Sequence, residues 1–430
     1  MNSIKLASIA LRNLFRNSRR TLITVLVSSA GFAALGIVAG YMDFTFYGLK
    51  ELTISRGFSA GGGTGHLQIF DQNLLKREEE YPMQYGISNN KSIQTKIESI
   101  PDVSFSMPRI EFNGLISNGD KSISFLGLGV DPKKEAGLMH YWNTLEKMSA
   151  KSRMDDSAYR KLAEEPSSAG VLLGGEMAKA LHAKTGSSLM LMSTTVDGAV
   201  NVVDVTVSGI MRNPMKSLDQ HYLLADIETV QRLLQTDKIS KIVVVLHKTE
   251  QTSSIQPLVS SKINRLRSNP VYSVMPWEEL AEYYHSVRDA YNIIFSFTGI
   301  IVVVIVFLSS TNTMLMATME RIREIGTLKA IGVSNGWISL MFLFEGFFIG
   351  VMSVFIGIIL QYIFSSVINN SGFKMPPPPG MSSSYLLNIY PATEWLPWIA
   401  LLIIISTTFS GLLTLVKIRK ISIVDSLSHV

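Results

Sequence analysis

The sequence has no cysteine among its 430 residues and few charged residues for its length. Without cysteine the chain can form no disulfide bond and carry out no thiol catalysis. Charged residues make up 17% and hydrophobic residues 47% of the chain, and with long uncharged runs this composition is typical of a membrane protein. The seven histidines are scattered, without H-x-x-x-H spacing, so we expect no metal site.

Charges are scarce in four runs that are each long enough to cross a bilayer as a helix, which takes about 20 residues. The basic residues flank these runs, so the net charge of +5 does not indicate nucleic-acid binding. We predict spans at residues 21–42, 289–319, 337–364 and 395–416. The remaining segments are residues 1–20, 43–288, 320–336, 365–394 and 417–430.

Residues 43–288 contain no further spanning run and are expected to form a large domain outside the membrane. Asn118-Gly119 and Asp197-Gly198 are hairpin signals. Alternating strands and helices predict an α+β domain rather than a pure β-sandwich. We expect strands at 66–70, 105–117, 122–130, 189–196, 200–207 and 241–246, helices at 90–100, 176–182, 226–235 and 252–267, and weaker helical signals over 133–166.

Two stretches of this domain have alternative interpretations. Residues 57–61 match the G-x-S-x-G pattern of a serine hydrolase around Ser59, but that motif needs a strand before it and a helix after it. The glycine-rich residues 61–65 lack the lysine of a phosphate-binding loop, so we expect a flexible joint. Three methionines, Met190, Met192 and Met211, are expected to be core residues on strands. The alternative is that they line an apolar surface that binds hydrophobic ligands.

A dense charge cluster lies in the short segment 320–336, between the second and third predicted spans. So short a loop cannot hold a large active site, and we expect it to be a docking surface for a soluble partner. Glu320 and Arg323 are three residues apart and can pair along one helix face. The proposed coupling residues are Glu320, Arg321, Arg323, Glu324, Gly326, Lys329 and Gly332.

The helix that leads into this loop is expected to be unusually long. No proline occurs between Trp277 and Glu320, and a continuous helix over that range is about 65 Å long at 1.5 Å per residue. The hydrocarbon core takes only about 30 Å of this length, so the rest is expected to form a stalk. Its apolar face comprises Trp277, Leu280, Tyr283, Val287 and Tyr291, and packing against a neighbouring stalk is the simplest role for that face.

Two polar residues lie inside predicted spans. Glu345 is about 12 Å inside the third span if Trp337 marks its start. An acidic group at that depth is costly and indicates a functional role, although a fixed packing partner is the alternative. Asn312, in the second span, is the other intramembrane candidate. Small residues for close helix packing are Gly36, Gly40, Gly346 and Gly350.

The orientation follows from the distribution of Lys and Arg. Residues 1–20 read as an amphipathic helix in the membrane interface, with Lys5, Arg12, Arg16 and Arg19 on its polar side. The following uncharged run is too long for a signal peptide. The connector 365–394 has one basic residue, Lys374. Positive charge marks the cytoplasmic side, so both termini and segment 320–336 are expected there.

Several motifs resemble one family. Pro276-Trp277-Glu278-Glu279-Leu280, Asn312-Thr313-Met314, the stretch from Glu320 to Gly332, and Glu345-Gly346 look like the MacB/FtsX/LolC-LolE permeases of ABC transporters. The resemblance is specific over residues 312–346 and looser in the domain. It implies four membrane helices, with a two-part α+β periplasmic domain between the first and second.

The resemblance also implies partners. It implies a pair of permeases, as a homo- or heterodimer, in the bacterial inner membrane with a cytoplasmic ATPase dimer. This sequence has no Walker A motif, so ATP and Mg²⁺ are expected in that separate subunit. A periplasmic adaptor or a lipoprotein carrier is a further expected partner. Lipoprotein release is favoured, with MacB-like efflux or FtsX-like activation of a cell-wall hydrolase as alternatives.

The orientation can be tested with single introduced cysteines, because the chain has none of its own. Ser124→Cys and Ser382→Cys should react with an impermeant maleimide in intact spheroplasts, whereas Ser334→Cys should not. Labelling of Ser334→Cys without the other two would reverse the predicted orientation.

Overall fold

The computed structural model describes residues 10–14, 16, 18–74, 83, 85–144, 157–164, 169–213, 215–264, 271–376 and 384–419. The chain divides into two compact units, a helical unit of residues 1–46, 287–373 and 387–430, and a mixed unit of residues 47–286 and 374–386. Residues 10–14 of the predicted amphipathic helix are helical. Lys5, residues 377–380 of the proline run, and Ser382 lie outside the described residues.

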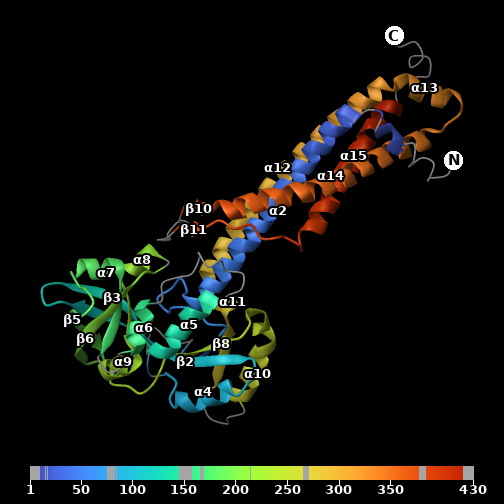
Figure 1. The fold of residues 1–430 in the computed structure, drawn as a ribbon. Coiled ribbons are helices and arrows are strands. Elements are labelled where there is room, and N and C mark those ends of the chain that lie inside the picture. Colours follow the sequence, from blue (N-terminus) through green and yellow to red (C-terminus); the bar gives the residue numbers. More distant parts are fainter. Residues whose placement is uncertain are drawn as a thin grey trace. The chain divides into compact units, whose positions relative to one another are not determined.

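Long apolar helices dominate the helical unit (Figure 1). Helices α2 (Ser18–Ser55), α12 (Glu282–Glu320) and α14 (Asn335–Ser371) are long and apolar enough to cross a membrane. Helix α15 (Leu396–Arg419) contributes a shorter apolar stretch, Leu396–Leu412. This arrangement, with an α+β domain between α2 and α12, confirms the predicted fold class.

Glycine allows α14 and α15 to pack closely. A Cβ on Gly346 would lie 2.6 Å from the Thr407 carbonyl oxygen, and one on Gly350 would lie 2.5 Å from Thr407 Oγ1. Gly36 and Gly40 of α2 are similarly crowded, by the Gln361 side chain and the Tyr390 carbonyl. In a membrane such small residues let helix backbones approach.

A closed ring of strands organises the mixed unit. The strands are β1 (Leu67–Asp71), β2 (Val103–Ser117), β3 (Ser122–Val130), β4 (Gly170–Gly174), β5 (Ser188–Thr194), β6 (Val200–Met211), β7 (Tyr222–Asp226), β8 (Lys241–Leu246) and β9 (Tyr272–Pro276). They pair in the order β3-β7-β4-β6-β5-β2, and β2 also pairs with β3, which closes a six-stranded barrel. The order continues β2-β8-β1-β9 as an open sheet.

Strand β2 is long because it belongs to both parts. Its first half pairs with β8, from Val103 to Arg109, and its second half pairs with β3 and β5. Around the sheet lie α4 (Asn90–Glu98), α5 (Pro132–Thr144), α6 (Ser157–Glu164), α7 (Gly175–Ala180), α8 (Lys216–Asp219), α9 (Ile227–Leu234), η2 (Thr249–Gln251) and α10 (Thr252–Asn264). Two short strands, β10 (Lys374–Met375) and β11 (Tyr385–Leu386), pair with each other.

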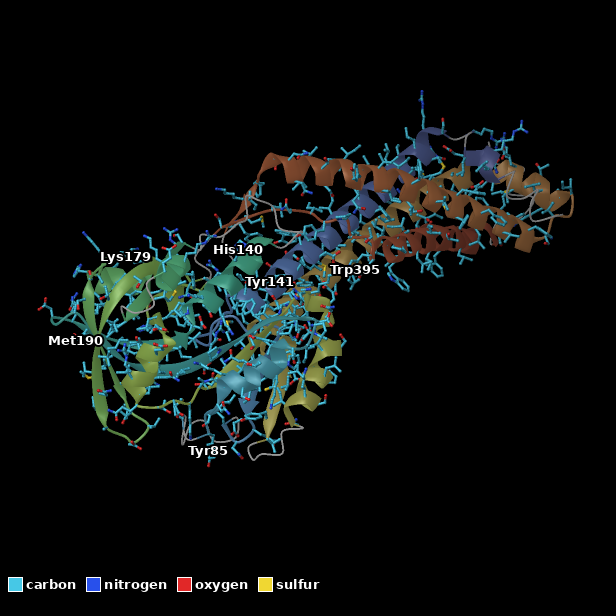
Figure 2. All side chains as sticks on the ribbon, turned by 60° about the horizontal axis from the view of Figure 1, so that its bottom comes forward. Tyr85, His140, Tyr141, Lys179, Met190 and Trp395 are labelled. Atoms are coloured by element: carbon cyan, nitrogen blue, oxygen red, sulfur yellow. The ribbon has the colours of Figure 1, made fainter. Side chains whose placement is uncertain are left out.

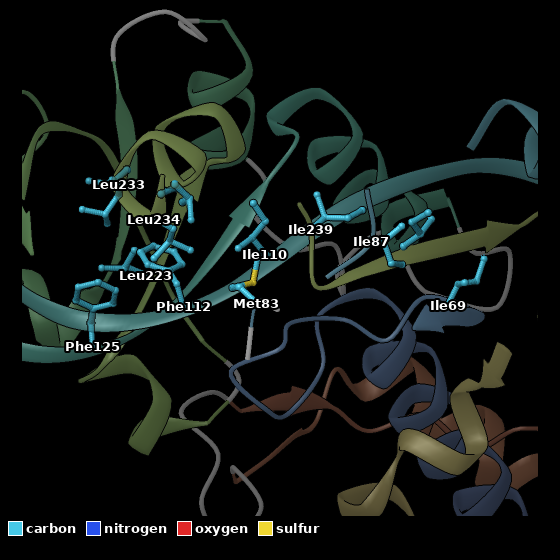
Figure 3. Packing of buried hydrophobic residues seen from close by; sticks show 14 of the residues in the cluster. Ile69, Met83, Ile87, Ile110, Phe112, Phe125, Leu223, Leu233, Leu234 and Ile239 are labelled. Atoms are coloured by element: carbon cyan, nitrogen blue, oxygen red, sulfur yellow. The ribbon is translucent and has the colours of Figure 1, made fainter. Parts of the chain in front are cut away.

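The core of the mixed unit is continuous through both parts of the sheet. Helix α9 contributes Leu233 and Leu234, which are buried with Phe125 and Leu223 of the barrel strands (Figure 3). Ile69 and Ile87 extend the same cluster to the open sheet. The apolar i, i+3 and i+4 spacing of α9 explains why one face of this helix is buried.

The glycine-rich residues 61–65 connect α2 to β1, where the sequence predicts a joint, and their backbone is held by hydrogen bonds. Arg109 is fully buried, and its Nη1 donates to the carbonyl oxygens of Gly61, at 3.0 Å, and Gly63. Its Nη2 donates to both oxygens of Glu135, at 3.0 and 2.9 Å. A Cβ on Gly63 would overlap the Ser55 carbonyl, so glycine is required for this close approach.

The predicted continuous helix from Trp277 is interrupted. Helix α11 (Trp277–Leu280) ends before Ala281, whose φ of −98° and ψ of 55° are not helical, and α12 begins at Glu282. Trp277 is buried and packs edge-on against Tyr284, with ring centroids 5.1 Å apart. The buried tryptophan thus holds a separate turn, and the helix restarts after it.

A buried polar chain ties the end of α2 to the sheet. The Leu246 N–H donates to His66 Nδ1 at 3.1 Å, so the imidazole proton is on Nε2, 3.1 Å from Thr249 Oγ1. Thr249 Oγ1 in turn donates to the Glu51 carboxylate at 3.0 Å. Burial, with a smaller effect of Lys50, lowers the pKa of His66 to about 3.

This pKa shift predicts a loss of stability in mild acid. The unfolded chain protonates His66 below about pH 6.5, whereas the folded chain keeps it neutral until about pH 3. His66 should therefore lower the free energy of unfolding by about 1.4 kcal/mol for each pH unit below 6.5. Pulse proteolysis of the full chain should show a smaller pH dependence for His66→Asn than for the unchanged protein. Equal pH dependence would contradict this assignment.

Candidate functional site

A buried ion pair lies at one end of the helical unit. Arg321 Nη1 is 3.0 Å from Glu345 Oε1, and the two residues are 6% and 5% exposed. Asn13 completes the cluster from the N-terminal segment, because its Nδ2 donates to Glu345 Oε1 at 3.0 Å. Its carbonyl oxygen accepts a bond from Arg321 Nη2 at 3.1 Å. Three segments that are distant in sequence therefore meet at one carboxylate.

A break between two helices turns Arg321 inward. Helix α12 ends at Glu320 and α13 (Ile322–Ala330) begins after Arg321, which has φ −103° and ψ 15°. The Arg321 N–H donates to the Thr318 carbonyl at 3.1 Å, and the Arg321 carbonyl accepts from the Ile325 N–H at 2.9 Å. Arg321 thus caps α13 while its side chain reaches α14.

Apolar packing surrounds the ion pair. Ile325 of α13 is buried in a cluster with Ile338, Met341 and Phe342 of α14, and Ala10 joins this cluster. Removing one member of a buried ion pair costs about 3–5 kcal/mol, because the remaining charge has no partner. The pair and the apolar cluster together fix α13 against α14.

Two exposed ion pairs flank this site. Arg16 pairs with Glu324, and Arg20 Nη2 lies 2.5 Å from Glu320 Oε1. The Arg16 and Glu324 side chains are 55% and 53% exposed, so this pair contributes only about 0–1 kcal/mol. Glu320, which the sequence suggests could pair with Arg323 along one helix, lies on α12 and is paired with Arg20.

The outer face of α13 combines charge with one exposed apolar side chain. Arg323, Glu324 and Thr327 are exposed, and Ile331, just past the helix, is 72% exposed. Gly332 follows with φ +90°, a conformation that favours glycine. Sequence reasoning missed Thr327 and Ile331. Their i+4 and i+8 spacing from Arg323 would have placed them on the same helix face.

The predicted coupling residues therefore divide into two groups. Arg323 and Glu324 are exposed, as a docking surface requires, and Lys329 is half-buried. Arg321 and Gly326 are buried. Arg321 thus binds α14 within the chain, which a count of charges along the loop could not reveal.

The predicted stalk residues pack within their own units. Tyr283 lies against Phe58, with ring centroids 4.4 Å apart, and Tyr291 lies 6.4 Å from Phe46. Leu280 and Val287 are half-buried. Asn312, in contrast, is exposed on α12.

The other candidate sites are weak. Ser59 follows helix α2 and precedes β1, so the strand–turn–helix context of a hydrolase nucleophile is missing from these described residues. The described residues contain no group of three or more His, Asp or Glu that could hold a metal ion. Met211 is buried as predicted. Met190 (Figure 2) and Met192 are exposed on β5, so the core prediction is wrong for these two.

Comparison with protein families gives two matches. Residues 21–261 match the MacB-like periplasmic core domain, and residues 294–423 match the FtsX-like permease C-terminal region. The first match covers more than half of the chain. The second includes Arg321, Glu345 and all of α13.

Relatives of known name share parts of this sequence. The ABC transporter permease YtrF of Bacillus subtilis (strain 168) is 47% identical over 73 residues, 17% of each chain. The lipoprotein-releasing system transmembrane protein LolE of Haemophilus influenzae is 21% identical over 280 residues, 64% of this chain and 63% of the relative. The chain thus spans less than two thirds of either relative.

Among solved structures, the periplasmic region of MacB from Actinobacillus actinomycetemcomitans aligns with 52% of this chain and 94% of its own length. The identity is 13% and the TM-score 0.34.

The ion pair predicts contrasting effects of two isosteric changes. Glu345→Gln removes the buried carboxylate from Arg321 and should lower the free energy of unfolding by about 3–5 kcal/mol. Glu324→Gln breaks an exposed pair and should change it by at most about 1 kcal/mol. Unfolding of the purified full chain in detergent, followed by tryptophan fluorescence, measures both. Equal effects would show that Glu345 is not held as an ion pair.

Proposed function

We propose that this chain is the membrane subunit of a transporter driven by a separate ATPase. The chain belongs to the family of ABC transporter permeases with a MacB-like periplasmic core domain and an FtsX-like C-terminal region. The observation that carries the proposal is the outer face of α13, which is exposed on one side and fixed to α14 on the other. In this proposal ATP and Mg²⁺ bind to the partner, and the permease itself is not an enzyme.

The surface of α13 has the properties of a docking site for a soluble protein. Charged groups such as Arg323 and Glu324 set register and partner choice. An exposed apolar side chain such as Ile331 can supply an anchor in a pocket of the partner. The positively charged flanks support a cytoplasmic position for this surface, with the α+β domain in the periplasm and the helices in the bacterial inner membrane.

Force applied to α13 has a defined route into the helical unit. Because Arg321 and Ile325 attach α13 to α14, a displacement of α13 moves α14 with it or breaks a buried ion pair. The Glu345 carboxylate also accepts a hydrogen bond from Asn13, so the N-terminal segment would move together with α14. Helix α12, which ends one residue before Arg321, carries the movement toward the periplasmic domain.

The substrate is proposed to be a lipid-anchored protein extracted from the outer leaflet. Alignments with LolC and LolE, over 45% and 64% of this chain, support this class, and an alignment with MacB over 86% of the chain supports the efflux alternative. Such a system would work as a pair of permeases, with a lipoprotein carrier on the periplasmic side.

Release of a radiolabelled lipoprotein from proteoliposomes only with ATP would support this role. ATP-dependent binding of a periplasmic adaptor without release would favour MacB-like efflux, and activation of a cell-wall hydrolase without any transport would favour an FtsX-like role.

The docking surface can be tested with charge and apolar substitutions. Arg323→Glu and Ile331→Glu alter the exposed face of α13 without touching the buried pair. Each should weaken association with the ATPase by about 10-fold or more, because anchor residues at an interface often contribute 2 kcal/mol or more. Surface plasmon resonance with the purified full-length permease measures the affinity.

Lys374→Glu, which makes the same charge change as Arg323→Glu on the exposed strand β10, is the matched control and should leave the affinity unchanged. Normal affinity for both α13 variants would refute α13 as the docking surface.

A further inference from the structure

Helix α12 is the most exposed of the long apolar helices. Only 11% of the residues in its apolar span are buried, against 50% in α2 and 33% in α14. Its buried residues are Val306, Ser310, Met314 and Thr318, which recur every four residues and form one ridge. The opposite face carries exposed apolar side chains at Phe297, Ile301, Ile305, Leu308 and Met319.

Asn312 lies in the middle of this exposed face. It is two residues from Ser310, hence about 200° around the helix from the buried ridge at about 100° per residue. It is also eight residues before the charged Glu320, or about 12 Å along the axis. Because the uncharged run extends from Ala290 to Met319, Asn312 lies within the hydrocarbon layer.

The Asn312 amide is the polar group at the centre of the exposed face of α12, whereas another unbonded group near it, the Thr311 hydroxyl, is buried. The hydroxyls of Thr298, Thr313 and Thr318 each bond a carbonyl four residues earlier, and Ser310 bonds Ser410 at 2.8 Å. The Asn312 side chain forms no hydrogen bond with any residue that the structure describes. An amide facing lipid chains would leave two donors and one acceptor unsatisfied, which is unfavourable in hydrocarbon.

We propose that this face of α12 binds the same face of a second copy, with the two Asn312 side chains hydrogen-bonded across a two-fold axis. An amide carries both a donor and an acceptor, so a second Asn312 satisfies it without any other polar group. The apolar positions at spacings of three and four residues around it form the seam of a helix pair. The inference deepens the proposed function, on which it rests, by naming the surface of the second permease.

The exposed face of α14 supports the choice of α12. Phe347, Val351, Phe355, Ile358 and Ile359 are exposed there and are all apolar. Lipid chains can cover such a surface at no polar cost. Lipid chains cannot cover the exposed face of α12 in the same way, because they offer no hydrogen-bond partner to the Asn312 amide. A single polar residue in an apolar helix–helix seam fixes the register and the oligomeric state.

Disulfide cross-linking in membranes from cells that lack the ATPase tests the proposed face. Ile301→Cys, Ile305→Cys and Leu308→Cys, which all keep Asn312, should give dimers of this chain under oxidation, because a disulfide needs Cα atoms about 4.4–6.8 Å apart. Val306→Cys and Ser310→Cys, on the buried ridge, should not. Equal cross-linking at all five positions, none at the first three, or cross-linking to a different protein would overturn the proposal.

The role of the amide needs a second measurement. Energy transfer between two differently labelled copies in lipid vesicles reports their association. Asn312→Leu should weaken association about 3- to 18-fold, whereas Asn312→Gln, which keeps an amide, should restore most of it. Thr313→Val is the matched control and should have no effect, since the Thr313 hydroxyl is bonded within its own helix.

Equal association of the Asn312→Leu and Asn312→Gln variants would overturn the role of the amide. Both experiments are done without the ATPase, so their failure is distinguishable from a failure of docking at α13.

Discussion

The Arg321–Glu345 ion pair is the interaction on which the helical unit depends. Burying a carboxylate deep in the apolar helix α14 is costly, and so is burying the guanidinium of Arg321, which lies at the break before α13. Their meeting at 3.0 Å offsets part of both costs and closes the turn between α12 and α14. The position of the N-terminal segment at Asn13 and the attachment of α13 to α14 depend on this contact, and the proposed route from docking surface to helices runs through it.

The mixed unit uses the same physical device. Buried Arg109 holds the backbone of the glycine-rich segment and Glu135 of α5, and buried Glu51 holds Thr249 and, through it, His66. In each case a charge buried without a partner would be strongly destabilising, so the groups around it have little freedom. The end of α2 and the glycine-rich segment after it are therefore fixed by hydrogen bonds as well as by apolar packing.

The sequence predicted the parts of the fold that have local signals. The run Lys241–Leu246 and the hairpin at Asp197-Gly198 are present as β8 and as the turn between β5 and β6. Strand β7 (Tyr222–Asp226) was missed because its short apolar run is buried throughout and shows no alternation. The sequence predicted that Glu345 lies within an apolar helix, but not which residue pairs with it. The direction of Arg321 depends on a helix break at that residue, and neighbouring charges in a loop look alike in sequence.

A double-mutant cycle on Arg321 and Glu345 tests the central claim most directly. The free energy of unfolding is measured for the unchanged chain, Arg321→Met, Glu345→Leu and the double variant. If each charge depends on the other, both single variants lose about 3–5 kcal/mol, and the double variant, which buries only apolar groups, regains most of that loss. Additive losses in the double variant would show that the two residues do not stabilise each other, and would contradict the account of how α13 is held.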